Sequence, residues 1–399
     1  MPDDIALTQR PDTQATSRLR LVDADAHLDP PHIMWREYLP AQLRELAPYI
    51  EEGEEHDWVV FEGKKRPLQM INNQAGRTGK NFKMTGRLSD MRAAWQPQAR
   101  LADMDHDGIE AAVIYGGGPL GTMNSELYIA SFEAYNRWLQ DFCGTDRKRL
   151  AGVAYLPMRD IDETLGLLRK AAALGFRNVN IPAFPQSTDG ISTSARVTAI
   201  AAGQGAALTG NPAGDSSYAD PEFDRLWAEI SELDLTVTIH LGGRVPRFGE
   251  KKHFLPDMSM SKLAMAEPIN ILIYGGVFQR FPKLRFVSAE SGVGWFAWMA
   301  EYMDRVWEKQ RFWTESVLTQ PPSYYMDQNI YGSFINDRIG VMCRNEPGGK
   351  NIMWSSDYPH SETSFPNSHA VIARDFAGVP EAETQEIVGE RARRVFAVG

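Results

Sequence analysis

Short apolar segments alternate with longer amphipathic segments along most of the chain. The apolar segments are rich in β-branched residues and predict buried strands, whereas the amphipathic segments predict helices, such as those at about 124–143, 161–174 and 262–280. The predicted strands end near residues 27, 115, 156, 181, 240, 290, 334 and 357. Strands and helices in alternation predict an α/β fold with a parallel sheet, and eight strands favour a closed (β/α)8 TIM barrel. An open doubly wound sheet is the alternative, but the first turn has no G-x-G-x-x-G sequence for a dinucleotide.

Two stretches interrupt this alternation. Residues 50–97 are charged and contain glycine, and they are too long for an ordinary connection between a strand and a helix. Residues 186–219 are rich in Ser, Thr, Gly and Ala. We interpret both as insertions that cover the catalytic face and contribute substrate contacts. Residues 1–19 are polar and predict a mobile N-terminal arm, so residues 20–399 form a single barrel domain in this interpretation.

Composition and charge exclude several classes of function. A chain of 399 residues with 43% hydrophobic and 24% charged residues is typical of a globular protein with an ample core. The net charge of −10 disfavours nucleic acid as a partner. No signal peptide and no apolar run of roughly 18 residues is present, which predicts no membrane partner. Cys143 and Cys343 lie far apart, so we expect neither a disulfide nor a thiolate metal site, and a cytoplasmic location.

Four of the predicted strands end on residues that commonly bind metal ions. The first strand carries Asp25 and His27 at alternate positions, which places both on one face together with Asp23. The fifth strand ends at His240, the sixth at Glu290 and the eighth at Asp357. The carboxyl ends of barrel strands meet on one face, where barrel enzymes have their active sites. We therefore predict a divalent metal site there, although a turn role for Asp25 and an ordinary strand-end role for His27 remain alternatives.

The sequence resembles the amidohydrolase superfamily, and within it the branch of the aminocarboxymuconate-semialdehyde decarboxylase-like proteins. The resemblance is carried by Asp-Ala-Asp-Ala-His at 23–27, Glu-Ser-Gly-Val-Gly-Trp at 290–295 and Ser-Asp-Tyr-Pro-His at 356–360. Further matching stretches lie at residues 100–108, 134–139, 150–157 and 220–240. The resemblance implies a TIM barrel with a metal site whose ligands come in the order first strand, fifth strand, sixth strand and eighth strand.

Two positions depart from the pattern that the family commonly shows. Asp25 stands where the first histidine of a His-x-His pair is common, a change to a carboxylate that some decarboxylase members share. Glu290 stands where the sixth strand often ends on histidine, and in the family decarboxylases that histidine is thought to handle the proton. No lysine ends the fourth strand, so the carbamylated lysine of many dinuclear members is not expected.

The resemblance also suggests roles for individual residues. Asp357 is expected to bind the metal weakly and to take a proton from metal-bound water. Glu290 could orient a ligand or bridge to a second ion, and His360 is expected to contact the substrate or a ligand. Trp295 and Tyr358 are weaker candidates for the walls of the substrate pocket, since aromatic residues more often belong to the core.

Three reactions fit these residues. Hydrolysis of an amide, ester or lactone of a small organic substrate by metal-activated water is the first hypothesis. The second is O2-dependent hydroxylation at two iron or manganese ions, because up to three carboxylates and three histidines suit iron or manganese better than zinc. Non-oxidative decarboxylation of a small carboxylic acid is the third. The expected cofactor is one or two ions of Zn, Mn or Fe, and homo-oligomer formation is left open.

Overall fold

The structure is a computed structural model that describes residues 18–77, 79–91, 95–185, 216–241 and 254–399. The predicted N-terminal arm at 1–19 and the predicted insertion at 186–219 therefore lie almost wholly outside the described residues. The remaining predicted strands and helices can be compared with the observed ones.

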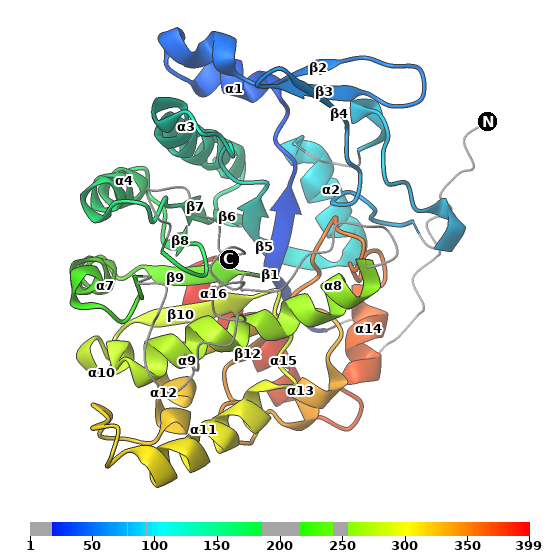
Figure 1. Ribbon diagram of the computed structural model, residues 1–399. Helices are drawn as coiled ribbons and strands as arrows, with labels where there is room; N and C mark the ends of the chain where they lie inside the picture. Colours follow the sequence, from blue (N-terminus) through cyan, green and yellow to red (C-terminus); the bar gives the residue numbers. More distant parts are fainter. Residues whose placement is uncertain (1–17, 78, 92–94, 186–215, 242–253) are drawn as a thin grey trace.

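Parallel strands form the centre of the molecule (Figure 1). In chain order the barrel strands are β1 (Leu21–Leu28), β5 (Ile109–Gly116), β6 (Leu150–Gly152), β7 (Ala154–Tyr155), β8 (Asn178–Asn180), β9 (Thr236–His240), β10 (Arg285–Ala289), β11 (Ile330–Phe334) and β12 (Ile352–Trp354). Strands β6 and β7 are two parts of one predicted strand, separated only at Val153. Hydrogen bonds connect them in the orders β1-β5-β6 and β7-β8-β9-β10-β11-β12. The predicted α/β barrel with parallel strands is confirmed.

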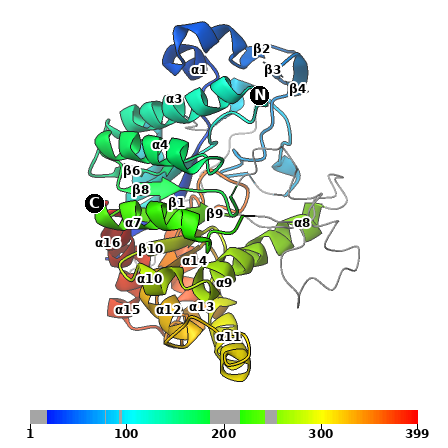
Figure 2. The ribbon, with the colours of Figure 1, turned by 60° about the vertical axis from the view of Figure 1, so that its left-hand side comes forward.

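Helices surround these strands, and the turned view shows α3, α4 and α7 stacked along one side (Figure 2). The α-helices are α1 (Ile33–Tyr38), α2 (Pro97–Asp107), α3 (Ser125–Cys143), α4 (Ile161–Ala173), α7 (Asp224–Glu232), α8 (Phe254–Ser261), α9 (Ala266–Tyr274), α10 (Val277–Arg280), α11 (Phe296–Gln310), α12 (Pro322–Asn329), α13 (Arg338–Met342), α14 (Ser368–Asp375), α15 (Glu381–Gln385) and α16 (Arg391–Phe396). The short helices are η1 (Ala41–Leu46), η2 (Gly79–Asn81), η3 (Leu88–Asp90), η4 (Pro221–Phe223), η6 (Lys262–Met265) and the π-helical η7 (Glu386–Glu390).

Local sequence explains several helix boundaries. The side chain of Asn124 accepts a hydrogen bond from the amide of Leu127 and begins α3, and Asp160 begins α4 in the same way. The prediction of one helix over 262–280 was wrong, because η6, α9 and α10 divide that stretch. Gly276 has a φ of 71°, a left-handed conformation that ends α9 and lets α10 start in a new direction.

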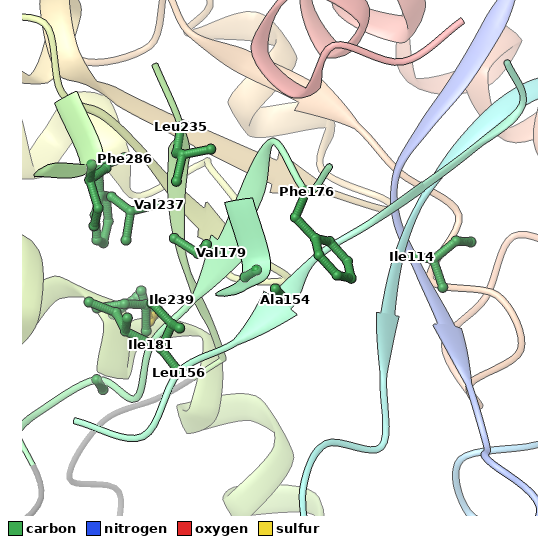
Figure 3. Packing of buried hydrophobic residues seen from close by; sticks show 14 of the residues in the cluster. Ile114, Ala154, Leu156, Phe176, Val179, Ile181, Leu235, Val237, Ile239 and Phe286 are labelled. Carbon is green, nitrogen blue, oxygen red and sulfur yellow. The ribbon is translucent and has the colours of Figure 1, made fainter. Parts of the chain in front are cut away.

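The apolar core has two layers, as expected when alternate residues of a strand point to opposite sides. Val179, Val237 and Ile239 face the surrounding helices (Figure 3). Val22, Ala24, Ala111, Val113, Val287 and Met353 face the barrel interior. The pairing of β1 with β5 shifts register between Asp23 and Ala26, so Asp25 and His27 also face the interior. Asp23 lies on the opposite side, beside α2, and its predicted place on the same face was wrong. Residues of α16 belong to that interior group, and the backbone oxygen of Val395 accepts a hydrogen bond from Thr236 at the start of β9. Helix α16 therefore closes the amino-terminal end of the barrel and leaves the carboxyl ends of the strands for the site.

The predicted insertion at 50–97 has a fold of its own. It contains a three-stranded antiparallel sheet of β2 (Tyr49–Glu51), β3 (Trp58–Phe61) and β4 (Lys64–Pro67), which lies beyond the carboxyl end of β1 in Figure 1. Its later part approaches the predicted site, since the amides of Gln74 and Ala75 donate to the oxygen of Pro359 at 2.8 and 3.0 Å. Substrate contacts from this insertion stay a prediction.

Candidate metal centre

Strand β1 places Asp25 and His27 side by side at its carboxyl end, and both side chains are buried. Strand β9 adds His240, whose ring lies edge-on to the His27 ring with 4.8 Å between the ring centres. Asp25 Oδ1 lies 3.2 Å from His240 Nε2 and 3.3 Å from His27 Nε2. Two predicted histidine ligands, His27 from β1 and His240 from β9, therefore converge on one carboxylate oxygen of the third, Asp25.

The turn after β12 brings Asp357 and His360 to the same place. Asp357 Oδ1 lies 3.0 Å from His27 Nε2 and 2.9 Å from His360 Nδ1. The rings of His27 and His360 are stacked, with 3.8 Å between their centres and 17° between their planes. The sequence predicted His360 as a contact at this site, and the structure places its ring directly beside a predicted ligand.

Glu290 follows β10 and faces both the predicted ligands and a cation. Its Oε2 atom lies 3.6 Å from His240 Nε2, and its Oε1 atom lies 2.8 Å from Lys262 Nζ. Lys262, in η6, also lies 3.0 Å from Glu362 Oε2. The sequence analysis missed Lys262, because a single lysine in a predicted helix carries no signal that it faces a site.

Glu290 and Asp357 share an uncommon backbone conformation. Their φ angles are 55° and 57°, in the left-handed region that residues other than glycine seldom adopt. Glu290 directly follows β10, and Asp357 lies three residues after the end of β12. At both positions this conformation turns the chain away from the strand direction. Backbone strain of this kind is concentrated at functional sites and costs about 1–3 kcal/mol per residue.

Charges within the site shift the pKa values of its members. Burial alone would raise the pKa of Asp25, but His240 and His27 outweigh burial and hold that pKa well below its ordinary value. Burial would also raise the pKa of Asp357, which His360 and His27 hold well below its ordinary value. Burial would lower the pKa of His360, yet the charge of Asp357 raises it to about 9. Asp25 and Asp357 are therefore ionised at neutral pH.

Several buried atoms of the site have no hydrogen-bond partner in the part of the chain that the structure describes. These atoms are His27 Nε2 and both carboxylate oxygens of Asp357. The neighbouring ring nitrogens are close to Asp357, but their directions do not form hydrogen bonds. A buried carboxylate whose oxygens accept no hydrogen bond is costly, so a bound cation is a natural partner for Asp357. Oxygen and imidazole nitrogen ligands suit Mn, Fe or Zn, and the residues present therefore fit a divalent metal ion.

The potential ligand atoms fall into two overlapping groups, within each of which all of them lie within 4.8 Å of one another. One group is Asp25, His27, His240 and Glu290, and the other is His27, Glu290, Asp357 and His360. We refer to these six side chains as the ligand cluster. All five predicted metal ligands belong to it, and their binding of metal stays a prediction.

The two aromatic residues predicted to wall the substrate pocket lie differently. The Tyr358 side chain is buried, its hydroxyl donates to Asp103, and its ring packs under the guanidinium of Arg100 at 4.4 Å. Trp295 is half-buried and donates from its ring nitrogen to the backbone oxygen of Ser291 at 3.1 Å. Both side chains hold parts of the fold together, and these contacts favour packing roles over substrate contact.

Comparison with known proteins adds an independent line of evidence. A sequence model of the amidohydrolase family, described as "Amidohydrolase", matches residues 22–398. The 2-amino-3-carboxymuconate-6-semialdehyde decarboxylase of Dictyostelium discoideum is 20% identical over 275 residues, which are 66% of this chain and 67% of that protein.

Solved structures share the fold over nearly the whole chain. An amidohydrolase from Mycobacterium avium subsp. paratuberculosis K-10 matches with a TM-score of 0.68 and 18% identity, covering 96% of this chain and 99% of its own. A dihydroxybenzoic acid decarboxylase from Polaromonas sp. JS666, with bound manganese and the inhibitor 2-nitroresorcinol, matches with a TM-score of 0.61 and 15% identity, covering 95% and 97%. None of the described helices is long and apolar enough to cross a membrane.

Proposed function

The chain belongs to the amidohydrolase family, whose sequence model spans residues 22–398, and we propose that it is a metal-dependent decarboxylase of a small aromatic or conjugated carboxylic acid. Support comes from the decarboxylases among its similar proteins, several of which were solved with bound manganese. It also comes from the arrangement of proton-carrying groups in the ligand cluster. This proposal reverses the order of the hypotheses in the sequence analysis, which placed hydrolysis first.

The ion would be held by Asp25 and His27 of the first strand, His240 of the fifth and Asp357 in the turn after the last. When bound, a divalent ion supplies positive charge that binds and polarises oxygen atoms of the substrate. The buried positions of Asp25 and His27 exclude water from one side of the site.

The observation that carries the proposal is the position of His360. The sixth strand ends on Glu290 and lacks the histidine expected in family decarboxylases. His360 supplies an imidazole from the turn after the eighth strand instead, stacked on His27 and 2.9 Å from Asp357. Its ring is 21% exposed, whereas the Asp357 side chain is 1% exposed, so the imidazole forms the accessible end of this pair. A proton can therefore be delivered beside the ion.

The reaction balances with these groups alone. The bond between the substrate carbon and its carboxylate breaks, the electron pair of that bond stays on the carbon, and CO2 leaves. The His360–Asp357 pair gives one proton to the same carbon, and solvent restores that proton afterwards. No oxidant or reductant is required.

The test is a substrate panel offered to the manganese-loaded protein, with CO2 release as the measurement. We expect one or more hydroxybenzoates or conjugated acids to release CO2, and the product formed in D2O to carry deuterium at the vacated carbon. His360→Asn is expected to lower this rate by about 100-fold or more while the ion stays bound, since proton transfer is lost. His106→Asn, at an exposed histidine of α2, is the control and is expected to keep the rate.

Hydrolysis is the second candidate, and Asp357 is the observation that favours it. A buried carboxylate whose oxygens have no hydrogen-bond partner among the described residues can accept a proton from water as well as share one with His360. The same panel, extended with amides, esters and lactones, separates the two reactions. Release of an alcohol or amine with no CO2 from any acid would replace decarboxylation by hydrolysis.

Lys262 affects how many metal ions the site can bind. Its ammonium lies 2.8 Å from Glu290 Oε1 and neutralises the carboxylate that a second ion would need, so we expect one ion per chain. Lys262→Met frees Glu290 and is expected to raise the manganese content from one ion toward two, measured by elemental analysis after dialysis.

The control for that variant is Lys350→Met, which removes another ion-paired lysine, 2.6 Å from Asp327 and outside the ligand cluster. Its metal content is expected to stay at one. Glu290→Gln is also expected to keep one ion, bound about 10- to 100-fold more weakly. A wild-type protein that already holds two iron ions and consumes O2 would contradict the proposal and favour the hydroxylase of the sequence analysis.

A further inference from the structure

The barrel has a seam between its first and last strands. Strand β1 pairs with β5 and strand β12 pairs with β11, but no described strand ladder joins β1 to β12. Strand β12 ends at Trp354, and the residues after it continue beside β1 toward the metal site. Asp25 lies on β1 and Asp357 lies in the segment after β12, so these two carboxylates of the proposed ion site face each other across the seam.

Single hydrogen bonds close the seam where a ladder is missing. The amide of Asp357 donates to the oxygen of Asp25 at 3.0 Å, and the amide of His27 donates to the oxygen of Tyr358 at 2.7 Å. One step below them, the amide of Ser356 finds no backbone acceptor on β1. It donates instead to the side chain of Asp23, at 2.8 Å from Oδ1.

Asp23 holds both sides of the seam with one carboxylate. Oδ1 accepts hydrogen bonds from the amides of Ser356 and Asp25, the latter at 3.1 Å, and Oδ2 accepts from the hydroxyl of Ser356. Ser356 directly precedes Asp357, and Asp25 is the other carboxylate ligand. We propose that Asp23 is a positioning residue that fixes Asp25 and Asp357 relative to each other and so sets the geometry and affinity of the metal site.

A direct role of Asp23 as a ligand does not fit the contacts. Its oxygens already accept three hydrogen bonds, and it does not belong to either group of potential ligand atoms. The side chain is buried, with 1% of its surface exposed. Asp23 therefore acts on the ion only through the two segments that it joins.

The conformation of Asp357 explains why its flank must be held. Its φ of 57° is unfavourable unless the surrounding structure imposes it. Asp23 fixes the residue before Asp357, and the residue after it is fixed by Arg100, which donates to the backbone oxygens of His27 and, at 3.5 Å, Tyr358. Without Asp23 the turn can relax, and Asp357 can move away from Asp25.

The fold offers a matched control for this arrangement. Asp107, at the end of α2, accepts hydrogen bonds from both the amide and the hydroxyl of Ser368, at the start of α14. Both residues are buried, as Asp23 and Ser356 are. The chemistry is the same, but neither Asp107 nor Ser368 adjoins a residue of the ligand cluster.

The experiment compares the variants Asp23→Ala, Asp23→Asn, Ser356→Ala and Asp107→Ala in the full chain, with Mn²⁺ alone as the probe. Affinity is measured by titration of free Mn²⁺ with electron paramagnetic resonance, and the spectrum of the bound ion reports the symmetry of its ligands. Thermal unfolding of the same samples reports stability.

We expect Asp23→Ala to weaken Mn²⁺ binding about 10- to 100-fold and to broaden the spectrum of the bound ion, as is usual when a group that orients ligands is lost. Asp23→Asn is expected to retain affinity within a few-fold. The amide oxygen of the asparagine can accept hydrogen bonds from both backbone amides, and its NH2 group can donate to the hydroxyl of Ser356. Retained affinity would show that the hydrogen bonds of residue 23, rather than its charge, set the affinity for Mn²⁺. Asp107→Ala is expected to lower the unfolding temperature but to leave Mn²⁺ affinity and spectrum unchanged.

Two results would overturn the proposal. One is wild-type affinity and spectrum in Asp23→Ala, and the other is an equal loss of affinity in Asp107→Ala, which would point to general destabilisation. Should Asp23→Ala fail to fold, Ser356→Ala decides the matter, because it removes only a hydroxyl and is expected to weaken binding several-fold. Since only metal binding is measured, the outcome is independent of which reaction the enzyme catalyses.

Discussion

His240→Ala is expected to remove the bound metal ion and to lower turnover by about 1,000-fold or more. His240 is the only member of the ligand cluster supplied by β9, and its Nε2 atom lies 3.2 Å from Asp25 Oδ1. Without this nitrogen, the remaining residues hold the ion too weakly to supply the several kcal/mol by which a metal ion lowers a reaction barrier.

The fold is expected to survive this change. The apolar layers on both sides of the strands and the closure by α16 lie away from the end of β9. Elemental analysis and far-ultraviolet circular dichroism of the same preparation check both expectations. His106→Ala, which truncates a histidine outside the ligand cluster, serves as the control and is expected to keep metal and activity. Full metal occupancy in His240→Ala would show that His240 does not bind the ion and would contradict the site as described.

Asp357→Asn is expected to lower turnover by about 100- to 10,000-fold while most of the metal stays bound. An amide oxygen can still bind a cation, but an amide neither accepts nor relays the proton that the His360–Asp357 pair must deliver. The backbone should tolerate the change, because asparagine adopts the left-handed conformation observed at this position as readily as aspartate does.

Metal content and turnover, measured on the same preparation of Asp357→Asn, test this expectation. Asp375→Asn provides a matched control, since Asp375 is also buried and its Oδ2 atom also has no hydrogen-bond partner among the described residues, but it lies outside the ligand cluster. Its turnover is expected to match the wild type. If Asp357→Asn turns over at the wild-type rate, Asp357 takes no part in proton transfer, whichever reaction the enzyme catalyses.

The sequence by itself determined the barrel and the identity of the candidate ligands. Both follow from local pattern: a buried strand is a short apolar run, and a residue at its carboxyl end must lie on the same face as those of neighbouring parallel strands. Asp25, His27, His240, Glu290 and Asp357 were found in this way, and the structure brings their side chains together. The family assignment follows from the same residues and is confirmed by the family model.

Only the tertiary structure decided what surrounds those ligands. Lys262 reaches Glu290 from 28 residues away, and Ser356 reaches Asp23 across 333 residues, so neither contact leaves a trace in local periodicity. Tyr358 was only a weaker candidate for a wall of the substrate pocket, and the turn in which it lies directs its side chain toward Asp103 and Arg100. Strand positions are set by hydrophobic burial along the chain, whereas charge pairing and closure of the seam depend on distances that exist only after the barrel has closed.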